Sequence, residues 1–242
     1  LVGPQGICLV VDPDEAIPAF SSYPSDEHAF SVEVALPPVD ATRPIAWGVT
    51  FSQKFSEELG GDWRKTYRAI LDELRPTRLR LVAYWDRIEP TSGEFHFDDL
   101  DWQIQEARSR GIPVILAAGL KLPRWPECHE PMWARGLPTV EHDERIKLYL
   151  REVVSRYREE PAITMWQIEN EPYLLFGKCP RREGDFLEHE IALARSLDPS
   201  RPILVTDGGE FGLWTHAARE GDVFGTTMYR KAYPRIIGPL FG

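Results

Sequence analysis

The sequence predicts an α/β fold of the TIM (β/α)8 barrel type or, as an alternative, an open doubly wound sheet. From Ile45 onward, six apolar segments of strand length alternate with amphipathic segments of helix length. The strand segments are apolar on both faces, as in a parallel sheet covered by helices. No glycine-rich phosphate turn follows the first strand, where the chain reads GVTFSQKF, and this favours the barrel over a nucleotide-binding sheet.

Strands one to six are recognisable in order. The first helix begins near Asp62, a good N-cap, and Pro76 ends it; the second begins near Asp98 and stops at Gly111. A long loop rich in proline and tryptophan separates the third strand from the third helix. The expected strands are residues 45–51, 78–85, 113–119, 163–170, 203–209 and 223–229, and the later helices are residues 141–158, 184–197 and 212–219.

Residues 1–44 differ from the rest of the chain. They are rich in proline, serine and acidic residues and hold two short apolar runs, ICLVV and AFSVEVAL. We therefore expect an N-terminal extended arm or β-hairpin over residues 1–44, followed by a (β/α) barrel domain over residues 45–242.

Composition excludes several classes of function. A chain of 242 residues is long enough for one sizeable core. Its net charge of −10 argues against a nucleic-acid partner, which would favour a basic face. No apolar run approaches the roughly 20 residues of a membrane span. No signal peptide is visible and the chain starts at Leu1, so we expect a processed, trimmed or fragmentary chain, and we favour a secreted or periplasmic location.

The three cysteines show no CxxC or Cys/His spacing, so the sequence predicts no metal site, and it predicts no cofactor. Cys128 and Cys179 fall in two loops that we place on one face of the barrel. The sequence leaves open whether they form a disulfide or are free or buried thiols.

Charged groups gather where the fourth strand ends. Glu169, Asn170 and Glu171 lie there, and they are followed by Pro172, which disfavours a helix. In a barrel, the loops at the carboxyl ends of the strands form the pocket. Cleavage of a glycosidic bond needs two carboxyl groups across the scissile bond. Spacing alone does not choose between the two glutamates, because strand ends depart from ideal alternation.

The segment WQIENEP resembles the W-x-x-x-NEP segment of clan A glycoside hydrolases, which have cellulase-like barrels. The resemblance covers about residues 45–230. It implies that Glu171 is the general acid/base and that Asn170 binds the sugar 2-hydroxyl. Glu169 would then be a residue that supports these two without contacting the substrate. RLRLVAYWDRIEPTSGEFHFDDLDW resembles the strand-two stretch of the clan, and this implies that Arg80 supports the nucleophile. Tyr229, at the end of strand six, resembles a tyrosine that hydrogen-bonds the nucleophile.

One expected part is missing from this pattern. The nucleophile of the clan is a glutamate at the end of strand seven, and after Tyr229 the chain reads RKAYPRIIGPLFG. We expect a barrel that is incomplete at its C-terminus and lacks strands seven and eight. As alternatives, the N-terminal strands cover the gap, with Glu33 as a candidate nucleophile, or a second chain completes the barrel.

Further residues are candidates for binding substrate. Trp85 and Trp125 lie at or after strand ends and could stack on the apolar faces of sugars, or fill the core instead. Glu210 could bind substrate or only favour the start of the next helix. We expect a retaining glycoside hydrolase that cleaves β-linked sugars in an oligosaccharide or polysaccharide. The alternative is a non-catalytic, carbohydrate-binding barrel that lacks the nucleophile.

Overall fold

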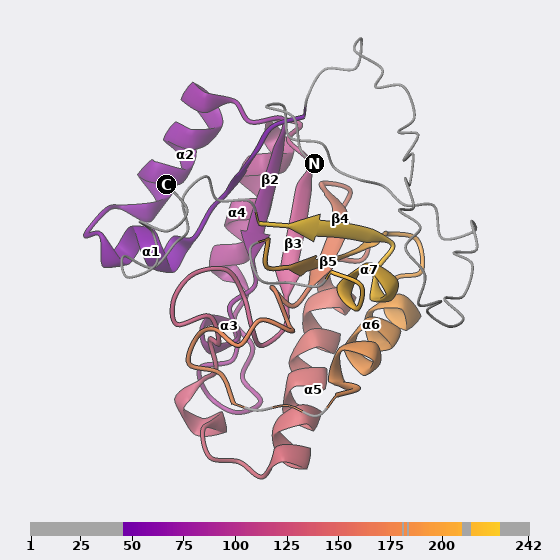
Figure 1. Ribbon diagram of the computed structural model, residues 1–242. Helices are drawn as coiled ribbons and strands as arrows, with labels where there is room; N and C mark the ends of the chain where they lie inside the picture. The colour runs from indigo at the N-terminus through magenta and orange to yellow at the C-terminus, as the bar shows by residue number, and fades with distance from the viewer. Residues whose placement is uncertain (1–45, 181, 183, 210–213, 228–242) are drawn as a thin grey trace, which may run out of the picture. The chain divides into compact units, whose positions relative to one another are not determined.

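The computed structural model describes residues 46–227, except 181, 183 and 210–213. In this part of the chain, six strands form one parallel sheet in the order β1-β2-β3-β4-β5-β6 (Figure 1). Each strand pairs with the next one along the chain, and every connection between them contains at least one helix, which is the repeat of a (β/α) barrel. The expected fold is confirmed as a curled part of a TIM-type barrel. The strands are β1 Gly48–Thr50, β2 Arg78–Val82, β3 Val114–Ala118, β4 Ile163–Ile168, β5 Ile203–Asp207 and β6 Val223–Thr226.

The helices follow the expected alternation, with additions. Asp62 caps the first expected helix, because its carboxylate accepts hydrogen bonds from the backbone N–H groups of Arg64 and Lys65. Two short helices, α1 and α3, were not expected. The helices are α1 Gln53–Glu58, α2 Trp63–Ala69, α3 Trp85–Ile88, α4 Asp98–Ser109, α5 Thr139–Tyr157, α6 Phe186–Leu197 and α7 Ala217–Glu220; a π-helical turn, Ile70–Leu74, continues α2, and a 3-10 turn, Met132–Ala134, precedes α5.

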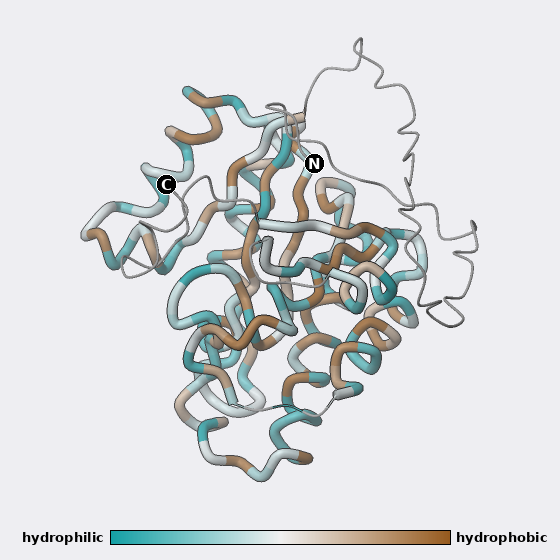
Figure 2. The backbone as a smooth tube through the Cα atoms, in the orientation of Figure 1, coloured by the Kyte–Doolittle hydropathy of each residue, from teal (hydrophilic) through white to brown (hydrophobic). Residues whose placement is uncertain are grey.

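The core lies between the sheet and helices α2, α4, α5 and α6. Tyr67, Tyr149 and Trp166 are fully buried there, together with aliphatic side chains from every strand from β2 to β5. Trp166 is a core residue, as expected from its place inside the fourth strand, and its indole N–H donates to Asp198. Figure 2 shows apolar residues along the central strands and alternating apolar and polar residues along α5 and α6. This packing fixes the ends of the strands relative to one another.

The chain divides into two units, Leu1–Ala46 and Trp47–Gly242. The predicted arm over residues 1–44, with Glu33, lies outside the described residues, so the domain division stays a prediction. Among the residues that the structure describes, no helix has the length and apolar character that crossing a membrane requires.

Candidate functional site

The chain changes direction where β4 ends. Glu169 and Glu171 both have positive φ angles, 58° and 49°, which non-glycine residues adopt rarely. The backbone N–H of Glu169 donates to Ala118 of β3 (3.0 Å), whereas that of Glu171 donates to Thr206 of β5 (3.0 Å). Because the segment is no longer extended, the alternation of an ideal strand fails here. The backbone N–H groups of the two glutamates therefore bond to the two strands on either side of β4, Glu169 to β3 and Glu171 to β5.

Glu171 is buried at the β5–β6 side of this turn. Thr227, just after β6, donates from its hydroxyl to Glu171 Oε1 (2.6 Å). Among the described residues, no hydrogen bond reaches the other carboxyl oxygen, Oε2. The ammonium group of Lys121 donates to the backbone carbonyl of Glu171 (2.8 Å) and holds the turn from the β3 side. Burial lowers the pKa of Lys121, and the nearby carboxylates oppose that shift. Glu171 is therefore a buried carboxyl group that is held through its backbone and through one of its two oxygens.

Asn170 and Arg80 are joined through Gln167. Gln167 is fully buried on β4, and its amide nitrogen donates to Asn170 Oδ1 (3.3 Å). Arg80 of β2 donates to the other end of the same amide (3.1 Å) and to the hydroxyl of Thr50 (2.9 Å). These bonds link β1, β2 and β4 next to Glu171. The structure thus brings Arg80, Asn170 and Glu171 together, as the sequence pattern requires, and the roles assigned to them stay predictions.

Glu169 belongs to a different set of contacts. Its carboxylate accepts the backbone N–H groups of Leu120 (2.8 Å) and Lys121 (2.6 Å) and an N–H of Arg182 (3.0 Å). Gly119 makes room for it, because a Cβ at that position would lie 2.8 Å from the carboxyl carbon of Glu169. Every carboxylate oxygen of Glu169 is therefore engaged in structural bonds.

Arg182 extends these contacts into a buried ionic group, which we call the arginine cluster: Glu169, Arg182, Glu190 and Asp143. The guanidinium lies 2.7 Å from a carboxylate oxygen of Glu190 on α6 and 3.2 Å from one of Asp143 on α5. Burial raises the pKa of Glu190 well above its ordinary value; the charge of Glu169 adds to the shift, and Arg182 opposes it. The cluster joins the end of β4 to the helical layer.

The expectation for Trp85 is not met. The second strand was expected over residues 78–85. In the structure it ends at Val82, and Trp85 is the first residue of α3. Its side chain is fully buried, packs edge-on against Trp133 and donates its indole N–H to Glu89 (2.8 Å). A ring without exposed surface cannot stack on a sugar. Trp85 is a core residue because the turn after β2 directs it inward.

Trp125 is exposed, as stacking on a sugar requires. Its ring is 56% exposed in the loop after β3 and lies edge-on to the exposed ring of Phe176 from the loop after β4 (centroids 5.9 Å apart). Lys178 lies over the same indole. Cys128 and Cys179 form a disulfide between these two loops, so the pairing left open by the sequence is present. The two loops form one rim.

Tyr229 and Glu210 lie outside the described residues, so their predicted contacts stay predictions. Asp207, which ends β5, accepts hydrogen bonds from the backbone N–H groups of Gly208 (2.7 Å) and Trp214 (3.2 Å). Its carboxylate therefore organises the loop after β5. Across the part of the chain that the structure describes, no group of three or more His, Cys, Asp or Glu side chains could hold a metal ion.

Comparisons with known proteins agree with this architecture. A family model described as "Glycosyl hydrolases family 2, TIM barrel domain" matches residues 130–237. Mannan endo-1,4-beta-mannosidase F of Aspergillus fumigatus is 22% identical over 66% of this chain and 44% of its own length. Human beta-glucuronidase is 36% identical over 26% of this chain and 9% of its own length. A variant of GH5_18 from Streptomyces cattleya, in complex with Manb1-4GlcNAc, superposes with a TM-score of 0.60 at 18% identity, over 76% of this chain and 52% of that one.

These matches support a glycoside hydrolase TIM-barrel family. The chain spans less than half the length of the curated relatives that it matches. In a glycoside hydrolase of this fold, the active site lies at the carboxyl ends of the strands. The turn at Glu169–Glu171 lies at that end of the described barrel strands.

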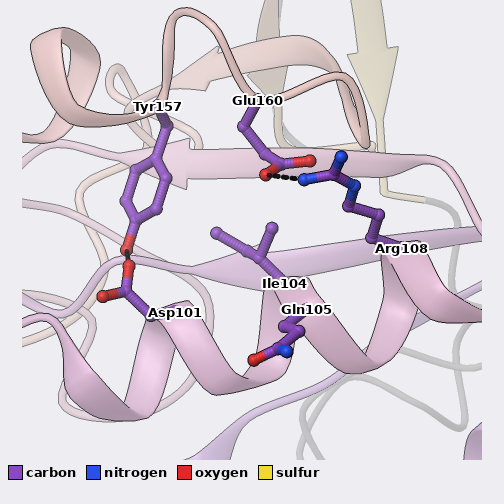
Figure 3. A pocket seen from close by; sticks show the side chains of 6 residues that line it. All are labelled: Asp101, Ile104, Gln105, Arg108, Tyr157 and Glu160. Atoms are coloured by element: carbon purple, nitrogen blue, oxygen red, sulfur yellow. Dashed lines mark hydrogen bonds and ion pairs between the residues drawn. The ribbon is translucent and has the colours of Figure 1, made fainter.

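Two cavities lie close to the elements of this barrel. One of about 490 Å³ lies between the loops after β3 and β4 and is lined by residues such as Leu120, Lys121, Glu169, Leu174, Phe176 and Arg182, but not by Glu171. The other, of about 300 Å³, lies between α4 and α5 (Figure 3). It adjoins the connection from α5 into β4, so it belongs to the amino ends of the strands. Its polar groups pair with each other, as Tyr157 does with Asp101 and Arg108 with Glu160.

Sequence reasoning missed several residues of the site. Thr206 lies near the end of β5 and Thr227 directly follows β6, so a search of strand ends for hydroxyl groups could have found them. Lys121 is buried in the loop after β3, although a lysine in a loop is ordinarily expected in solvent. Glu127, in the same loop as Lys121, was not considered, since nothing in a proline-rich loop indicates a buried carboxyl group.

Proposed function

We propose that this chain is part of a retaining glycoside hydrolase that cleaves β-linked sugars, with Glu171 as its general acid/base. The observation that carries the proposal is the setting of Glu171 at the carboxyl end of β4. Thr206 and Thr227 fix its backbone and Oε1, while Oε2 accepts no bond from the described residues. The match to a glycoside hydrolase TIM-barrel domain supports the same reaction class.

Glu171 has two tasks in this mechanism. Its protonated carboxyl group donates a proton to the glycosidic oxygen as the bond to the sugar breaks. The carboxylate then removes a proton from the water molecule that releases the sugar. The hydroxyl of Thr227 bonds to Oε1 only, so Oε2 is the oxygen that carries the proton. Asn170, with Oδ1 held by Gln167, presents its amide nitrogen to a sugar hydroxyl.

Retention of configuration requires a second carboxylate about 5–5.5 Å from the first, which attacks the sugar carbon. The family resemblance assigns that nucleophile to a strand that would follow β6, outside the described residues. Arg80 and Tyr229 are its proposed supports. The retaining mechanism therefore rests on the resemblance together with the place of Glu171.

The proposed substrate is an oligosaccharide or polysaccharide. The exposed rings of Trp125 and Phe176 provide a rim on which the apolar faces of sugars can stack. Glu210 is proposed as an additional hydrogen-bonding group. The relatives named above are a mannosidase and a glucuronidase, so β-mannosides and β-glucuronides are the first substrates to test.

A secreted or periplasmic location is proposed on the basis of the disulfide. Cys128 and Cys179 join two loops that are 51 residues apart in the chain. Such bonds persist in oxidising compartments and are rare in the reducing cytosol of mesophiles.

The test is trapping of the covalent intermediate. The protein is incubated with aryl β-mannosides, β-glucuronides and β-galactosides, and then with the matching 2-fluoro-glycosides. Turnover, followed by inactivation and by a mass increase on one glutamate peptide, is expected and would identify the nucleophile. Retained oligosaccharide binding without turnover and without labelling would overturn the hydrolase and favour the alternative, a carbohydrate-binding barrel without catalysis.

A further inference from the structure

The loops after β3 and β4 carry two aromatic side chains that pack together and stay exposed. Trp125 is 56% exposed and Phe176 is 54% exposed, and their ring centroids lie 5.9 Å apart at an interplanar angle of 62°. We call these two rings the ring platform. Because the rings come from different loops, their position relative to each other depends on the contacts that join those loops.

Two contacts join the loops directly beside the ring platform. Cys128 and Cys179 form a disulfide, with their Cα atoms 5.1 Å apart. The backbone N–H of Lys178 donates to the carbonyl of Pro126 (2.9 Å). Water competes for both groups of a hydrogen bond between loops that reach solvent, so its net contribution is modest. The disulfide is covalent and limits the separation of the loops in every conformation of the chain.

Gly177 sets how closely the two loops approach each other. A Cβ at this position would lie 2.6 Å from the Cβ of Glu127 and 2.9 Å from the carbonyl oxygen of Pro126, closer than real Cβ atoms come. Gly177 also has a φ of 97°, which residues with side chains disfavour. Its neighbour Lys178 places its ammonium group 5.6 Å from the indole centroid of Trp125. Any other residue in place of this glycine would push the loop away from the indole.

The disulfide also fixes the ring platform relative to the turn after β4. Cys128 is 4% exposed and pairs with Lys121 in a short antiparallel bridge. The ammonium group of Lys121 donates to the backbone carbonyls of Glu171 (2.8 Å) and Leu174 (2.6 Å). The disulfide therefore connects Cys179 to the same set of bonds that holds the turn. The rings keep one position relative to the proposed acid.

The ring platform and the carboxyl group of Glu171 lie toward different neighbours of β4. The carboxyl group accepts the hydroxyl of Thr227 (2.6 Å), which follows β6. Trp125 belongs to the loop after β3, the strand on the other side of β4. The cavity of about 490 Å³ that Phe176 lines does not include Glu171. A sugar unit stacked on the rings is therefore not the unit whose glycosidic oxygen Glu171 protonates.

We propose that the Cys128–Cys179 disulfide and Gly177 position the ring platform to stack on a sugar unit away from the bond that is cleaved. The proposal rests on the proposed function and narrows the substrate to a chain of β-linked sugars, because a single glycoside unit does not span the acid and the platform. Apolar ring faces stack on the C–H faces of sugars. Loops that are joined before binding lose less conformational entropy when the sugar binds, so the disulfide lowers KM. The disulfide and Gly177 act through the rings, so they are positioning residues and not catalytic ones.

The first test follows the indole itself and needs no activity. In protein labelled with fluorine-19 on its tryptophans, the variant Trp125→Phe identifies the Trp125 signal. Dithiothreitol then gives two electrons and two protons to the disulfide, which becomes two thiols, while dithiothreitol closes into its own cyclic disulfide. The Trp125 signal is expected to shift on reduction, and that of Trp214, an exposed ring in the loop after β5, is expected to stay unchanged.

Two results bear on this test. A Trp125 signal that reduction leaves unchanged would overturn the proposal. A shift of both signals would mean that the reduced chain loses its fold, and the same comparison is then made with Gly177→Ala, which keeps the disulfide. A Trp125 shift without a Trp214 shift is expected in that variant too, and its absence would likewise overturn the proposal.

The second test compares substrates of different length. The pair is an aryl β-glycoside and a β-linked oligosaccharide of the same sugar, beginning with aryl β-mannoside and β-1,4-mannohexaose. In the double variant Cys128→Ala and Cys179→Ala, KM for the oligosaccharide is expected to rise about tenfold, because two ring side chains and their loops must be ordered on binding. The kcat value and both constants for the aryl glycoside are expected to stay unchanged. Gly177→Ala should change KM in the same direction.

Matched controls separate positioning from general destabilisation. Trp125→Ala removes a ring of the platform and should raise KM for the oligosaccharide alone. Met132→Ala removes an exposed apolar side chain from the same loop and should match wild type. Cys8→Ser removes the third cysteine of the chain and should also match wild type. A merely structural role of the disulfide would lower the activity on both substrates equally.

The outcomes separate the two proposals. Turnover of both substrates without a change in KM for the oligosaccharide, or with equal losses on both, would reject the role of the disulfide and leave the role of Glu171 intact. Absence of turnover in the wild-type chain with every β-glycoside would reject the proposed function. In that case the fluorine-19 spectra still decide whether the disulfide positions Trp125.

Discussion

Glu169 and Glu171 stand two positions apart in the chain, but their carboxyl groups have opposite surroundings. Glu169 accepts two backbone N–H groups and an arginine within the arginine cluster, on the β3 and α6 side. Glu171 accepts one hydroxyl group, from Thr227, on the β6 side. The oxygens of Glu169 are therefore all used in holding the turn and the helical layer together, whereas Glu171 has one oxygen without a bond from the described residues. The contrast shows that two acids at one strand end can differ in every bonding partner.

The largest expected effect on activity comes from replacing Glu171. Glu171→Gln removes the proton donor but keeps an acceptor for Thr227. Turnover of substrates with poor leaving groups is expected to fall by roughly 10²–10⁴-fold, the usual contribution of a general acid. Steady-state kinetics on alkyl and dinitrophenyl glycosides measures the change, and the dinitrophenyl substrates should lose much less. Glu188→Gln, on an exposed face of α6, is the control. Undiminished turnover of the alkyl substrates would show that the acid is elsewhere.

The next effect concerns the Glu169 side. Glu169→Ala leaves the buried guanidinium of Arg182 without one carboxylate and leaves two backbone N–H groups without an acceptor. The free energy of unfolding is expected to fall by about 3–5 kcal/mol, as when one partner of a buried ion pair is removed. Urea unfolding followed by circular dichroism measures the change. Glu171→Gln in the same assay should stay within about 1 kcal/mol of wild type. Equal losses in both variants would erase the distinction between the two acids.

A smaller effect is expected from Thr227. Thr227→Val keeps the shape of the side chain and removes the hydroxyl group that donates to Glu171 Oε1. We expect kcat/KM to fall about tenfold, the equivalent of one ordinary hydrogen bond. Thr227→Ser, which keeps the hydroxyl, should recover most of the activity. If the valine variant matches wild type, the contact does not orient the acid.

The smallest effect is a change in pH dependence within the arginine cluster. Because burial raises the pKa of Glu190, the folded protein favours the protonated carboxyl group more than the unfolded chain does. This contribution to stability is fully present below the unfolded value, about 4.3, and is lost as pH rises through the folded value. Glu190→Gln resembles the protonated form, so its stability should fall less than that of wild type over this pH range. Thermal unfolding at a series of pH values measures the difference, and parallel curves would contradict it.

Much of the fold could be predicted from local pattern. The six strands and four main helices follow from apolar periodicity, and the Asp62 cap follows from residue type. Helix α1, Gln53–Glu58, was missed because its buried face consists of the polar residues Gln53 and Ser56, which show no apolar periodicity. Trp85 was placed in a strand because its apolar neighbours continue the pattern of β2. Neither error concerns the strand order, which depends on the alternation alone.

The candidate site could be located from the sequence but not assembled from it. Thr206 and Thr227 follow Glu171 by 35 and 56 residues, and Lys121 precedes it by 50. No local pattern indicates that these side chains meet, because they come from loops and strand ends that only the parallel sheet aligns. The same applies to Cys128 and Cys179, whose pairing the sequence left open.

The sequence by itself determined the barrel repeat and the position of Glu169, Asn170 and Glu171 at a strand end, since both depend on local periodicity and composition. The tertiary structure decided which way each carboxyl group faces and what bonds to it. The physical reason lies in the turn after β4, where two residues adopt positive φ angles and break the alternation. Neighbouring strands and loops, not near neighbours in the chain, then supply the partners that distinguish the two glutamates.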